Sequence, residues 1–277
     1  MNRKLSVCLY SPPSLLVKSY FDMIDLAVKY GLKNIEAKNI FELSTPNSQL
    51  ALKIKEYADR NGVAVPCLSI SADIVKEGGE RFVKKVSEYC KTAKILGAER
   101  LHHTIALGLD RPSEVIKNRS FYYEQGVKSA LKIRNCANEF GLSTVYENHG
   151  YVFNGTKGFS LFMRDIGGDC GIIADTGNIL FAEEKAVDFI MAFSKKIVNV
   201  HIKDYKICNG IKKYTTFGGK SLFECAPGDG DADVINALNL LKDSGYSGTL
   251  SLECSPHGKG TEYFEKGFSF IKNGLLL

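Results

Sequence analysis

The chain alternates between short apolar runs and longer stretches in which apolar residues recur every three or four positions. The short runs have the β-branched and apolar composition of strands. Eight of them centre near residues 4–9, 34–37, 64–70, 100–105, 143–147, 171–175, 197–202 and 249–253. The helical spacing in between is illustrated by Leu15, Leu16, Tyr20, Ile24 and Ala27, and by Val234, Ala237, Leu238 and Leu241. The pattern predicts eight strands alternating with helices.

Turn residues mark the boundaries of these elements. A glycine stands between a predicted helix and the next strand in AVKYG-LKNIE and AKILG-AERLHHT, where it supplies the left-handed end of a helix. Residues 44–46, Ser-Thr-Pro, predict the start of the second helix. The 228–233 stretch is expected to cap the seventh helix rather than bind phosphate, because its acids would repel an anion.

Alternating strands and helices predict an α/β fold with parallel pairing through right-handed crossovers. Eight such units in 277 residues fit a single (β/α)8 TIM barrel over residues 1–277, with no linker dividing it. An open doubly wound sheet is the alternative. It is disfavoured because the first strand lacks the glycine-rich turn that binds phosphate in such sheets.

Composition narrows the functional classes. Hydrophobic residues make up 44% and charged residues 24%, which is typical of a soluble globular protein rather than a disordered chain or a coiled coil. The net charge of +5 is weak support for nucleic-acid binding, and the short basic cluster at 203–213 is expected to be a solvated loop. We expect no nucleic-acid partner.

Compartment follows from three further features. No apolar run approaches the ~18 residues of a membrane-spanning helix, so no membrane association is expected. The start, MNRKLSVCLYSPP, lacks the cleavage site of a signal peptide. The eight cysteines contain no C-x-x-C pair and are expected to be reduced thiols. These features predict a cytoplasmic protein, and they leave open whether it forms a homo-oligomer.

Ionisable residues stand at the ends of four successive predicted strands: Glu147, Asp175, His201 and Glu253. In a barrel of this kind the chemistry lies where the strands end, so these side chains can converge on one point. Three uncompensated acids there would repel one another unless a cation lay between them. Three oxygen donors and one nitrogen donor suit Mn²⁺, Mg²⁺, Co²⁺ or Zn²⁺.

The chain resembles the xylose-isomerase-like TIM barrels, a superfamily of sugar phosphate isomerases and epimerases that also contains endonuclease IV. The matching stretches are YENHG (146–150), ADTGN (174–178), VHIKD (200–204), PGDGDAD (227–233) and LSLEC (250–254). The resemblance implies that Glu147, Asp175, His201 and Glu253 hold one divalent metal ion. It also implies that Glu147 and Glu253 are catalytic, because the two glutamates of these enzymes exchange protons with opposite faces of the substrate.

That scheme is chemically coherent. A proton beside a ketone is too weakly acidic for a carboxylate unless the developing enediolate is stabilised, which a bound cation does as a Lewis acid. The expected function is therefore a metal-dependent isomerase or epimerase acting on a small sugar or sugar phosphate.

Three alternatives remain. The first is a metal-dependent lyase that dehydrates a keto-inositol or similar polyol. The second is an endonuclease-IV-like hydrolase, and the third is a non-catalytic sugar-binding barrel.

Differences from the family patterns limit which functions the resemblance implies for this chain. Ketose 3-epimerases carry a glutamate, a histidine and an arginine where this chain has Phe153, Asn178 and Ile207, so their specificity is not expected here. Endonuclease IV binds three metals through additional histidines. This chain has five histidines, at 102, 103, 149, 201 and 257, and none in the 228–231 loop. A trinuclear phosphodiesterase site is therefore not expected.

Five further residues are candidates for substrate binding: Glu36, His102, His149, Asn178 and Lys203. His149 and Lys203 each stand two positions beyond a predicted ligand, so alternation directs them to the same side. Glu36 ends the second strand and could bond a substrate hydroxyl or balance a lysine. Asn178 could reach a ligand or belong to an ordinary turn. His102 and His103 are adjacent, so only one can face the barrel interior, and the register leaves open which one.

Overall fold

The computed structural model describes residues 6–12, 14–71, 73–77, 79–106, 108–208, 214–253 and 260–275. His257, Cys254 at the end of LSLEC and residues 209–213 of the basic cluster lie outside the described residues.

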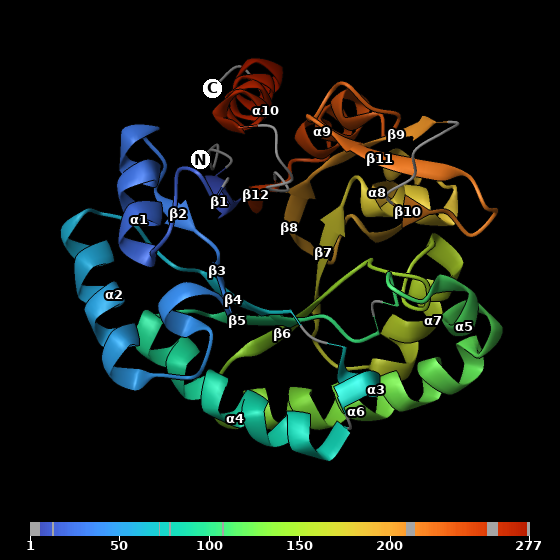
Figure 1. The fold of residues 1–277 in the computed structure, drawn as a ribbon, viewed down its shortest axis with the longest axis horizontal. Coiled ribbons are helices and arrows are strands. Elements are labelled where there is room, and N and C mark those ends of the chain that lie inside the picture. The colour runs from blue at the N-terminus through green and yellow to red at the C-terminus, as the bar shows by residue number, and fades with distance from the viewer. Residues whose placement is uncertain are drawn as a thin grey trace.

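A parallel barrel forms the centre of the molecule (Figure 1). Its strands are β1 (Ser6–Ser11), β2 (Asn34–Ile35), β3 (Ala37–Lys38), β4 (Cys67–Ile70), β5 (Arg100–His103), β6 (Ser143–Glu147), β7 (Gly171–Asp175), β8 (Ile197–Ile202) and β12 (Thr249–Glu253). They are ordered β2-β1-β12-β8-β7-β6-β5-β4-β3. Only Glu36 separates β2 from β3, so the two ends of this order are halves of one strand and the sheet closes as eight strands. The predicted α/β TIM barrel is confirmed.

Helices surround the barrel (Figure 1). They are α1 (Tyr20–Lys29), α2 (Ser48–Arg60), α3 (Ile74–Glu77), α4 (Gly79–Leu96), α5 (Pro112–Lys117), α6 (Arg119–Glu139), α7 (Thr156–Ile166), α8 (Ala186–Phe193), α9 (Val234–Asp243) and α10 (Gly260–Leu275), with 3-10 turns at η1 (Phe41–Leu43) and η2 (Asn178–Ala182). Each larger helix turns an apolar stripe inward, as α1 does with Met23, Ile24 and Ala27. None of the described helices is long and apolar enough to cross a membrane.

Two predicted helix starts are wrong by a few residues. Helix α1 begins at Tyr20 because the Ser19 side chain accepts the N–H of Asp22, so Leu15 and Leu16 precede it and Leu15 is 74% exposed. Helix α2 is capped by Asn47, whose side chain accepts the Leu50 N–H at 3.0 Å. The predicted 44–46 start fails because Ser44 ends the η1 turn instead.

The long segment after β8 contains a small antiparallel sheet that the sequence did not predict. Strands β9 (Asp204–Cys208), β10 (Tyr214–Thr215) and β11 (Ser221–Cys225) pair in the order β10-β11-β9. The Asp204 carboxylate then accepts the N–H groups of Gly228, Gly230 and Ala232 at 3.0–3.1 Å. A Cβ at Gly230 would collide with this carboxylate, so the close approach requires glycine.

The expectation that 228–233 caps the next helix needs correction. Asp233 does occupy the N-cap position of α9, but its backbone is left-handed and its side chain forms no cap hydrogen bond. Its carboxylate accepts from the Asn236 side chain instead. The loop is therefore fixed mainly from β9, by Asp204.

The barrel interior changes from apolar to polar along the strands. Cys67, Val145 and Ile173 form a small apolar cluster. Side chains alternate along a strand, so Glu147 and Asp175, two positions beyond Val145 and Ile173, face the same interior one layer higher.

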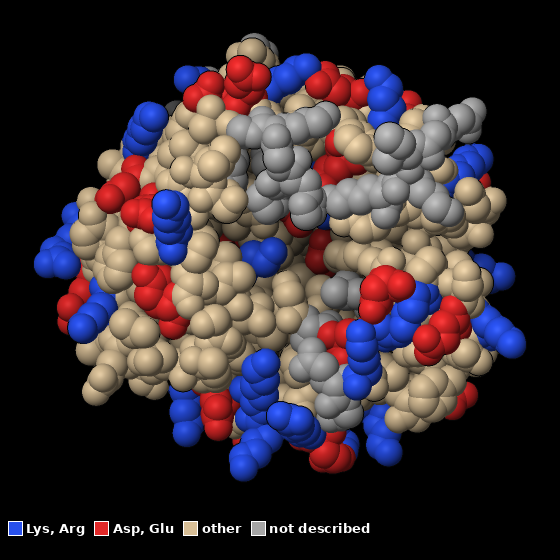
Figure 2. Space-filling view, viewed as in Figure 1, with Lys and Arg blue, Asp and Glu red and all other residues tan. Residues whose placement is uncertain are grey.

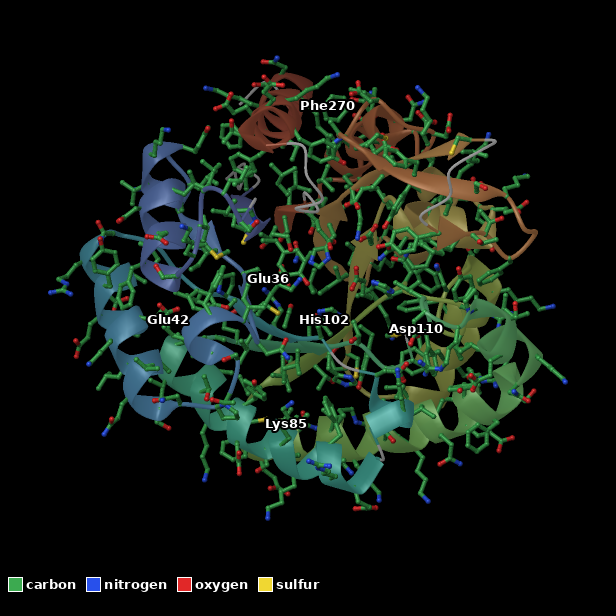
Figure 3. All side chains as sticks on the ribbon, viewed as in Figure 1. Glu36, Glu42, Lys85, His102, Asp110 and Phe270 are labelled. Carbon is green, nitrogen blue, oxygen red and sulfur yellow. The ribbon has the colours of Figure 1, made fainter. Side chains whose placement is uncertain are left out.

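Acidic and basic side chains are interspersed around one face of the molecule, and both reach a hollow at its centre (Figure 2). In the same view, Glu36 and His102 lie near the middle of the ribbon (Figure 3).

Candidate metal centre

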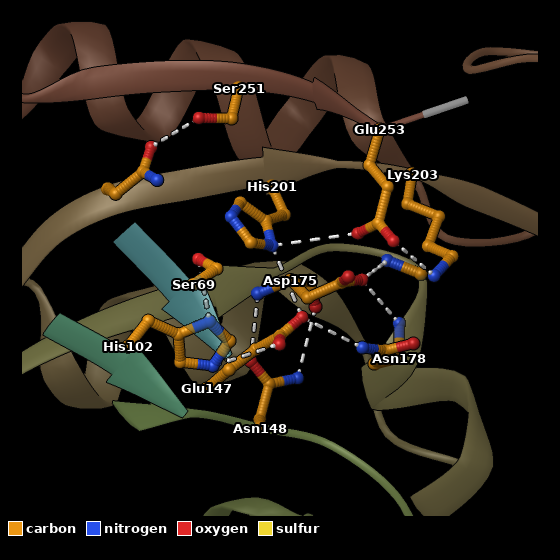
Figure 4. A network of polar contacts seen from close by, with 12 residues as sticks. Ser69, His102, Glu147, Asn148, Asp175, Asn178, His201, Lys203, Ser251 and Glu253 are labelled. Carbon is orange, nitrogen blue, oxygen red and sulfur yellow. Dashed lines mark hydrogen bonds and ion pairs between the residues drawn. The ribbon is translucent and has the colours of Figure 1, made fainter. Parts of the chain in front are cut away.

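Four strand-end side chains converge, as the sequence predicted. The ligand atoms of Glu147, Asp175, His201 and Glu253 all lie within 4.8 Å of one another (Figure 4). They come from β6, β7, β8 and β12, which are neighbours in the barrel. The first three side chains are buried and Glu253 is nearly so.

Asp175 has one oxygen held by the backbone and one without a partner. Its Oδ1 accepts the N–H groups of Gly177 and Asn178 at 2.8 and 2.7 Å, where the chain turns out of β7. Its Oδ2 is buried and has no hydrogen-bond partner. Burial raises the pKa of Asp175 well above its usual value, and the Lys203 ammonium opposes that rise only in part.

His201 lies between three carboxylates. Its Nδ1 is 3.2 Å from Glu147 Oε1 and 3.5 Å from Glu253 Oε2, while its Nε2 is 3.1 Å from Glu36 Oε2. Burial alone would lower the pKa of His201, but Glu36 and Glu147 outweigh it and raise the pKa well above its usual value. Without a metal, a proton on Nδ1 therefore compensates the surrounding acids.

The two glutamates have different partners. Glu147 Oε1 also accepts from the Asn178 side-chain amide at 3.1 Å. Burial would raise the pKa of Glu147, but His201 lowers it well below its usual value. Glu253 Oε1 accepts from Lys203 Nζ at 3.0 Å, whereas Oε2 has no hydrogen-bond partner. The pKa of Glu253 falls to about 2, because Lys203 and His201 outweigh the effect of burial.

The donor set fits a divalent cation. Four carboxylates, including that of Glu36, lie together inside the barrel, and the buried Lys203 ammonium pairs with one of them, that of Glu253. Two carboxylate oxygens, Asp175 Oδ2 and Glu253 Oε2, have no hydrogen-bond partner, although a buried polar atom without one is costly. Three oxygens and one imidazole nitrogen around one point are suitable ligands for Mn²⁺, Mg²⁺, Co²⁺ or Zn²⁺.

The structure brings four of the five predicted substrate residues to this centre. Lys203 and Asn178 contact the glutamates directly. His149 is half-buried, its Nδ1 has no hydrogen-bond partner, and burial lowers its pKa to about 4. His102 faces the interior with Nε2 3.4 Å from Glu147 Oε2. His103 points outward against the Tyr146 ring, which settles the register that the sequence left open.

Glu36 lies deeper than the predicted substrate role requires. It is 1% exposed, and its carboxylate contacts the side chains of Ser69, Asn199, His201 and Ser251 at 2.5–3.1 Å. Burial would raise the pKa of Glu36, but His201 and Ser69 lower it below its usual value. Because Glu36 is enclosed by these four protein partners, the expectation that it binds a substrate hydroxyl is corrected.

Sequence reasoning missed Tyr10 and Lys38. The register between β1 and β12 shifts between Leu9 and Ser11, and the Tyr10 ring stacks on His201 with centroids 4.3 Å apart. Lys38 Nζ lies 4.6 Å from the centre of that ring. The alternation that selected Lys203 could have found Lys38, because it stands two positions beyond Glu36. A strand bulge such as the one at Tyr10 has no comparable sequence signal.

Several curated relatives of the chain are named inosose dehydratases. An inosose dehydratase from Clostridium perfringens is 28% identical over 153 residues, which are 51% of this chain and 51% of that protein. An inosose dehydratase from Clostridium tetani is 23% identical over 235 residues, 80% of this chain and 78% of that protein. The chain spans about half the length, or less, of the first curated relatives it matches.

Solved structures share the fold over nearly the whole chain. The IOLI protein with a bound zinc atom superposes with a TM-score of 0.74 at 16% identity, covering 98% of each chain. D-psicose 3-epimerase with D-tagatose, from Clostridium cellulolyticum, gives 0.72 at 14% identity, again covering 98% of each chain. The family model for xylose isomerase-like TIM barrels matches residues 24–274. The chain belongs to the xylose isomerase-like TIM barrel family.

Proposed function

We propose that this protein is a divalent-metal-dependent enzyme that removes a proton from the carbon beside the carbonyl group of a small sugar-like ketone. The observation that carries the proposal is the convergence of Glu147, Asp175, His201 and Glu253 on one point, with unpartnered oxygens on two of them. These four residues would hold the ion. A bound divalent cation would polarise the substrate carbonyl as a Lewis acid.

Glu253 is the stronger candidate for the base. Its Oε2 has no hydrogen-bond partner, whereas Glu147 Oε1 is held by the Asn178 amide. The Lys203 ammonium and His201 hold the pKa of Glu253 near 2, so the carboxylate is ionised at neutral pH. Glu147 is fixed by Asn178 and His201 on the other side of the site. Each glutamate thus has a defined orientation before substrate arrives.

Loss of water from a keto-inositol is the outcome we favour. The two curated relatives from Clostridium perfringens and Clostridium tetani are named inosose dehydratases. The two residues that replace the glutamate and the arginine of the epimerase pattern cannot take over their polar contacts, since Phe153 packs on Phe162 and Ile207 is an apolar side chain 39% exposed on β9. In this reaction Glu253 takes the α-proton and Lys203 protonates the departing β-hydroxyl. A proton passing from Glu253 to Lys203 across their 3.0 Å contact then restores both groups.

Isomerisation or epimerisation is the second candidate. It is favoured by the two glutamates, which reach His201 Nδ1 from different strands at 3.2 and 3.5 Å. One carboxylate would remove the proton from one face of the substrate and the other would return it on the opposite face.

The deciding experiment uses Mn²⁺- or Zn²⁺-loaded protein in D₂O, with an inosose and with D-fructose as substrates. Loss of one water from the inosose, seen by mass spectrometry, supports the dehydratase. Deuterium uptake without water loss supports the isomerase or epimerase. If the loaded protein catalyses neither, the proposal fails, and a hydrolase or a sugar-binding barrel would account for the site better.

A further inference from the structure

A buried polar layer lies directly beneath the candidate metal centre. Its middle is the carboxylate of Glu36, between β2 and β3, and its partners come from three other strands. Oε1 is 2.5 Å from Ser69 Oγ on β4. Oε2 is 2.9 Å from Asn199 Nδ2 and 3.1 Å from His201 Nε2, both on β8, and 3.0 Å from Ser251 Oγ on β12.

The directions of these hydrogen bonds follow from what each group can donate. A carboxylate only accepts, so a nitrogen or hydroxyl that binds it must carry the proton. His201 therefore donates through Nε2, and its Nδ1 is the nitrogen left to face Glu147 and Glu253. The Glu36 carboxylate thus fixes the proton on Nε2 and leaves Nδ1 as the nitrogen that would hold a cation.

Ser69 extends this control to a second imidazole. A hydroxyl has one proton, and Ser69 gives it to Glu36 at 2.5 Å. The same Oγ lies 3.1 Å from His102 Nδ1, so that nitrogen must be the donor. A neutral imidazole carries one N–H, which leaves a lone pair on His102 Nε2. That atom is buried without a hydrogen-bond partner, 3.4 Å from Glu147 Oε2.

We propose that Glu36 is a positioning residue that fixes the tautomers of both His201 and His102, and that His102 Nε2 is an acceptor that binds a hydroxyl group of the substrate. A substrate hydroxyl that donates its proton to His102 Nε2 would supply the donor that this buried nitrogen lacks. The substrate would therefore be a polyhydroxy ketone with an unmodified hydroxyl group beside His102 Nε2. The hydroxyl contact rests on the proposed function, whereas the tautomer of His102 does not.

The tautomers are measured by long-range ¹H–¹⁵N correlation spectra of the Zn²⁺-loaded, ¹⁵N-labelled protein. Five histidines keep the spectrum simple, and His102→Asn identifies the ring in question. We expect His102 protonated on Nδ1 alone, and His201 protonated on Nε2 alone. A His102 ring protonated on Nε2, or on both nitrogens, would overturn the proposal without any variant of Glu36 or Ser69.

Two variants separate the direct contact from the relay. Glu36→Gln should weaken Zn²⁺ binding by about 10–100-fold, the usual effect of losing a ligand's hydrogen-bond partner. Ser69→Ala should leave Zn²⁺ binding within about threefold but raise KM roughly tenfold with kcat nearly unchanged, because it frees the His102 ring that holds the substrate. Thr92→Ala is the control, since this buried hydroxyl contacts only the backbone of its own helix.

The outcomes distinguish this proposal from the proposed function. Equal effects of Ser69→Ala and Thr92→Ala on KM and on the His102 spectrum would refute the relay. If the protein binds no Zn²⁺ at all, the proposed function fails, but the His102 tautomer remains measurable in the metal-free protein. Methylating the contacted hydroxyl of the inosose should weaken its binding to the wild type by at least about tenfold but change its binding to Ser69→Ala by less than about threefold, and an equal loss in both proteins would contradict the hydroxyl contact.

Discussion

The two halves of the barrel mouth differ in how their polar atoms are paired. In the half built from β6, β7, β8 and β12, acidic oxygens meet at one point and two of them have no partner. In the half built from β1, β3, β4 and β5, the Tyr10 ring stacks on His201, Lys38 lies over the Tyr10 ring, and Ser69 links Glu36 to His102. We propose that the first half holds a cation and that the second orients the side chains around it.

This difference shows that residue type alone does not define a role. Glu36 and Glu253 are both glutamates at the inner surface of the barrel. The carboxylate of Glu36 is occupied by four protein partners, while Glu253 keeps an oxygen without one. The unpartnered atoms mark where a ligand is needed, because buried polar groups are otherwise satisfied.

The largest expected effect is on turnover. Glu253→Gln keeps the size of the side chain but removes the base, so we expect kcat to fall by about 10²–10⁴-fold with the fold and the bound metal retained. Steady-state kinetics and metal analysis of the purified variant measure this. Glu183→Gln, which changes a surface glutamate bound to Lys220, is the matched control. Normal turnover by Glu253→Gln would contradict the assignment of Glu253 as the base.

Replacing one lysine in each half should lower the unfolding free energy by unequal amounts. Lys203→Met breaks a buried ion pair with Glu253 and should cost about 3–5 kcal/mol of unfolding free energy in the metal-free protein. Mn²⁺ should reduce that loss, since it replaces the missing positive charge. Lys38→Met, in the other half, should cost about 1 kcal/mol because it loses a cation–π contact and one long hydrogen bond to Ser11 Oγ but no ion pair. Urea unfolding with and without Mn²⁺ tests this, and equal losses for both lysines would refute the comparison.

His103, on the outer side of β5, should make the stability of the protein depend on pH. Burial lowers the pKa of His103 to about 3, whereas an unfolded histidine titrates near 6.5. Below about pH 6.5 the unfolded chain therefore gains a proton that the folded protein does not. Stability should fall as the pH drops towards 3, by about 2 kcal/mol at pH 5 from this group.

Unfolding midpoints at pH 7 and pH 5 test this sign. His103→Gln should reduce the difference between the two pH values, because glutamine does not titrate. Tyr146→Phe, which alters the neighbouring ring without a titrating group, should leave it unchanged. A difference that persists in His103→Gln would assign the acid sensitivity to other residues.

The smallest effect is the proton linkage of metal binding. Glu36 and Glu147 hold the pKa of His201 well above its usual value, so a cation at Nδ1 must displace a proton. The apparent metal affinity should fall by up to about tenfold for each unit that the pH drops below that pKa. Calorimetry in two buffers of different ionisation enthalpy should detect about one proton released per ion. Binding without proton release would contradict the assignment of Nδ1 as the ligand.

Much of the fold was predictable because strands and helices have different apolar periods. The eight strand runs match the barrel, and alternation correctly placed Lys203 beside the ligand set. The β9–β11 sheet was missed because β10 has only two residues, too few to show a period of two. The start of α2 was missed because two capping signals lie close together and only the three-dimensional turn at η1 selects Asn47.

The residues of the site that stand at strand ends were predictable, whereas those whose roles depend on how deeply they lie inside the barrel were not. Glu147, Asp175, His201 and Glu253 converge because neighbouring parallel strands end at the same rim. The inner position of Glu36 depends on partners contributed by three other strands, which spacing along one strand does not reveal. The inward face of His102 depends on the register of β5 against β4 and β6.

The central claim is that one divalent ion binds at the four converging residues, and metal content tests it most directly. Protein purified without chelator and analysed by inductively coupled plasma mass spectrometry should contain about one divalent ion per chain, and Asp175→Ala should lose it. Asp231→Ala, which alters an exposed carboxylate, should keep it. Absence of metal from the wild type after soaking in Mn²⁺ or Zn²⁺, or equal metal content in Asp175→Ala, would contradict the account.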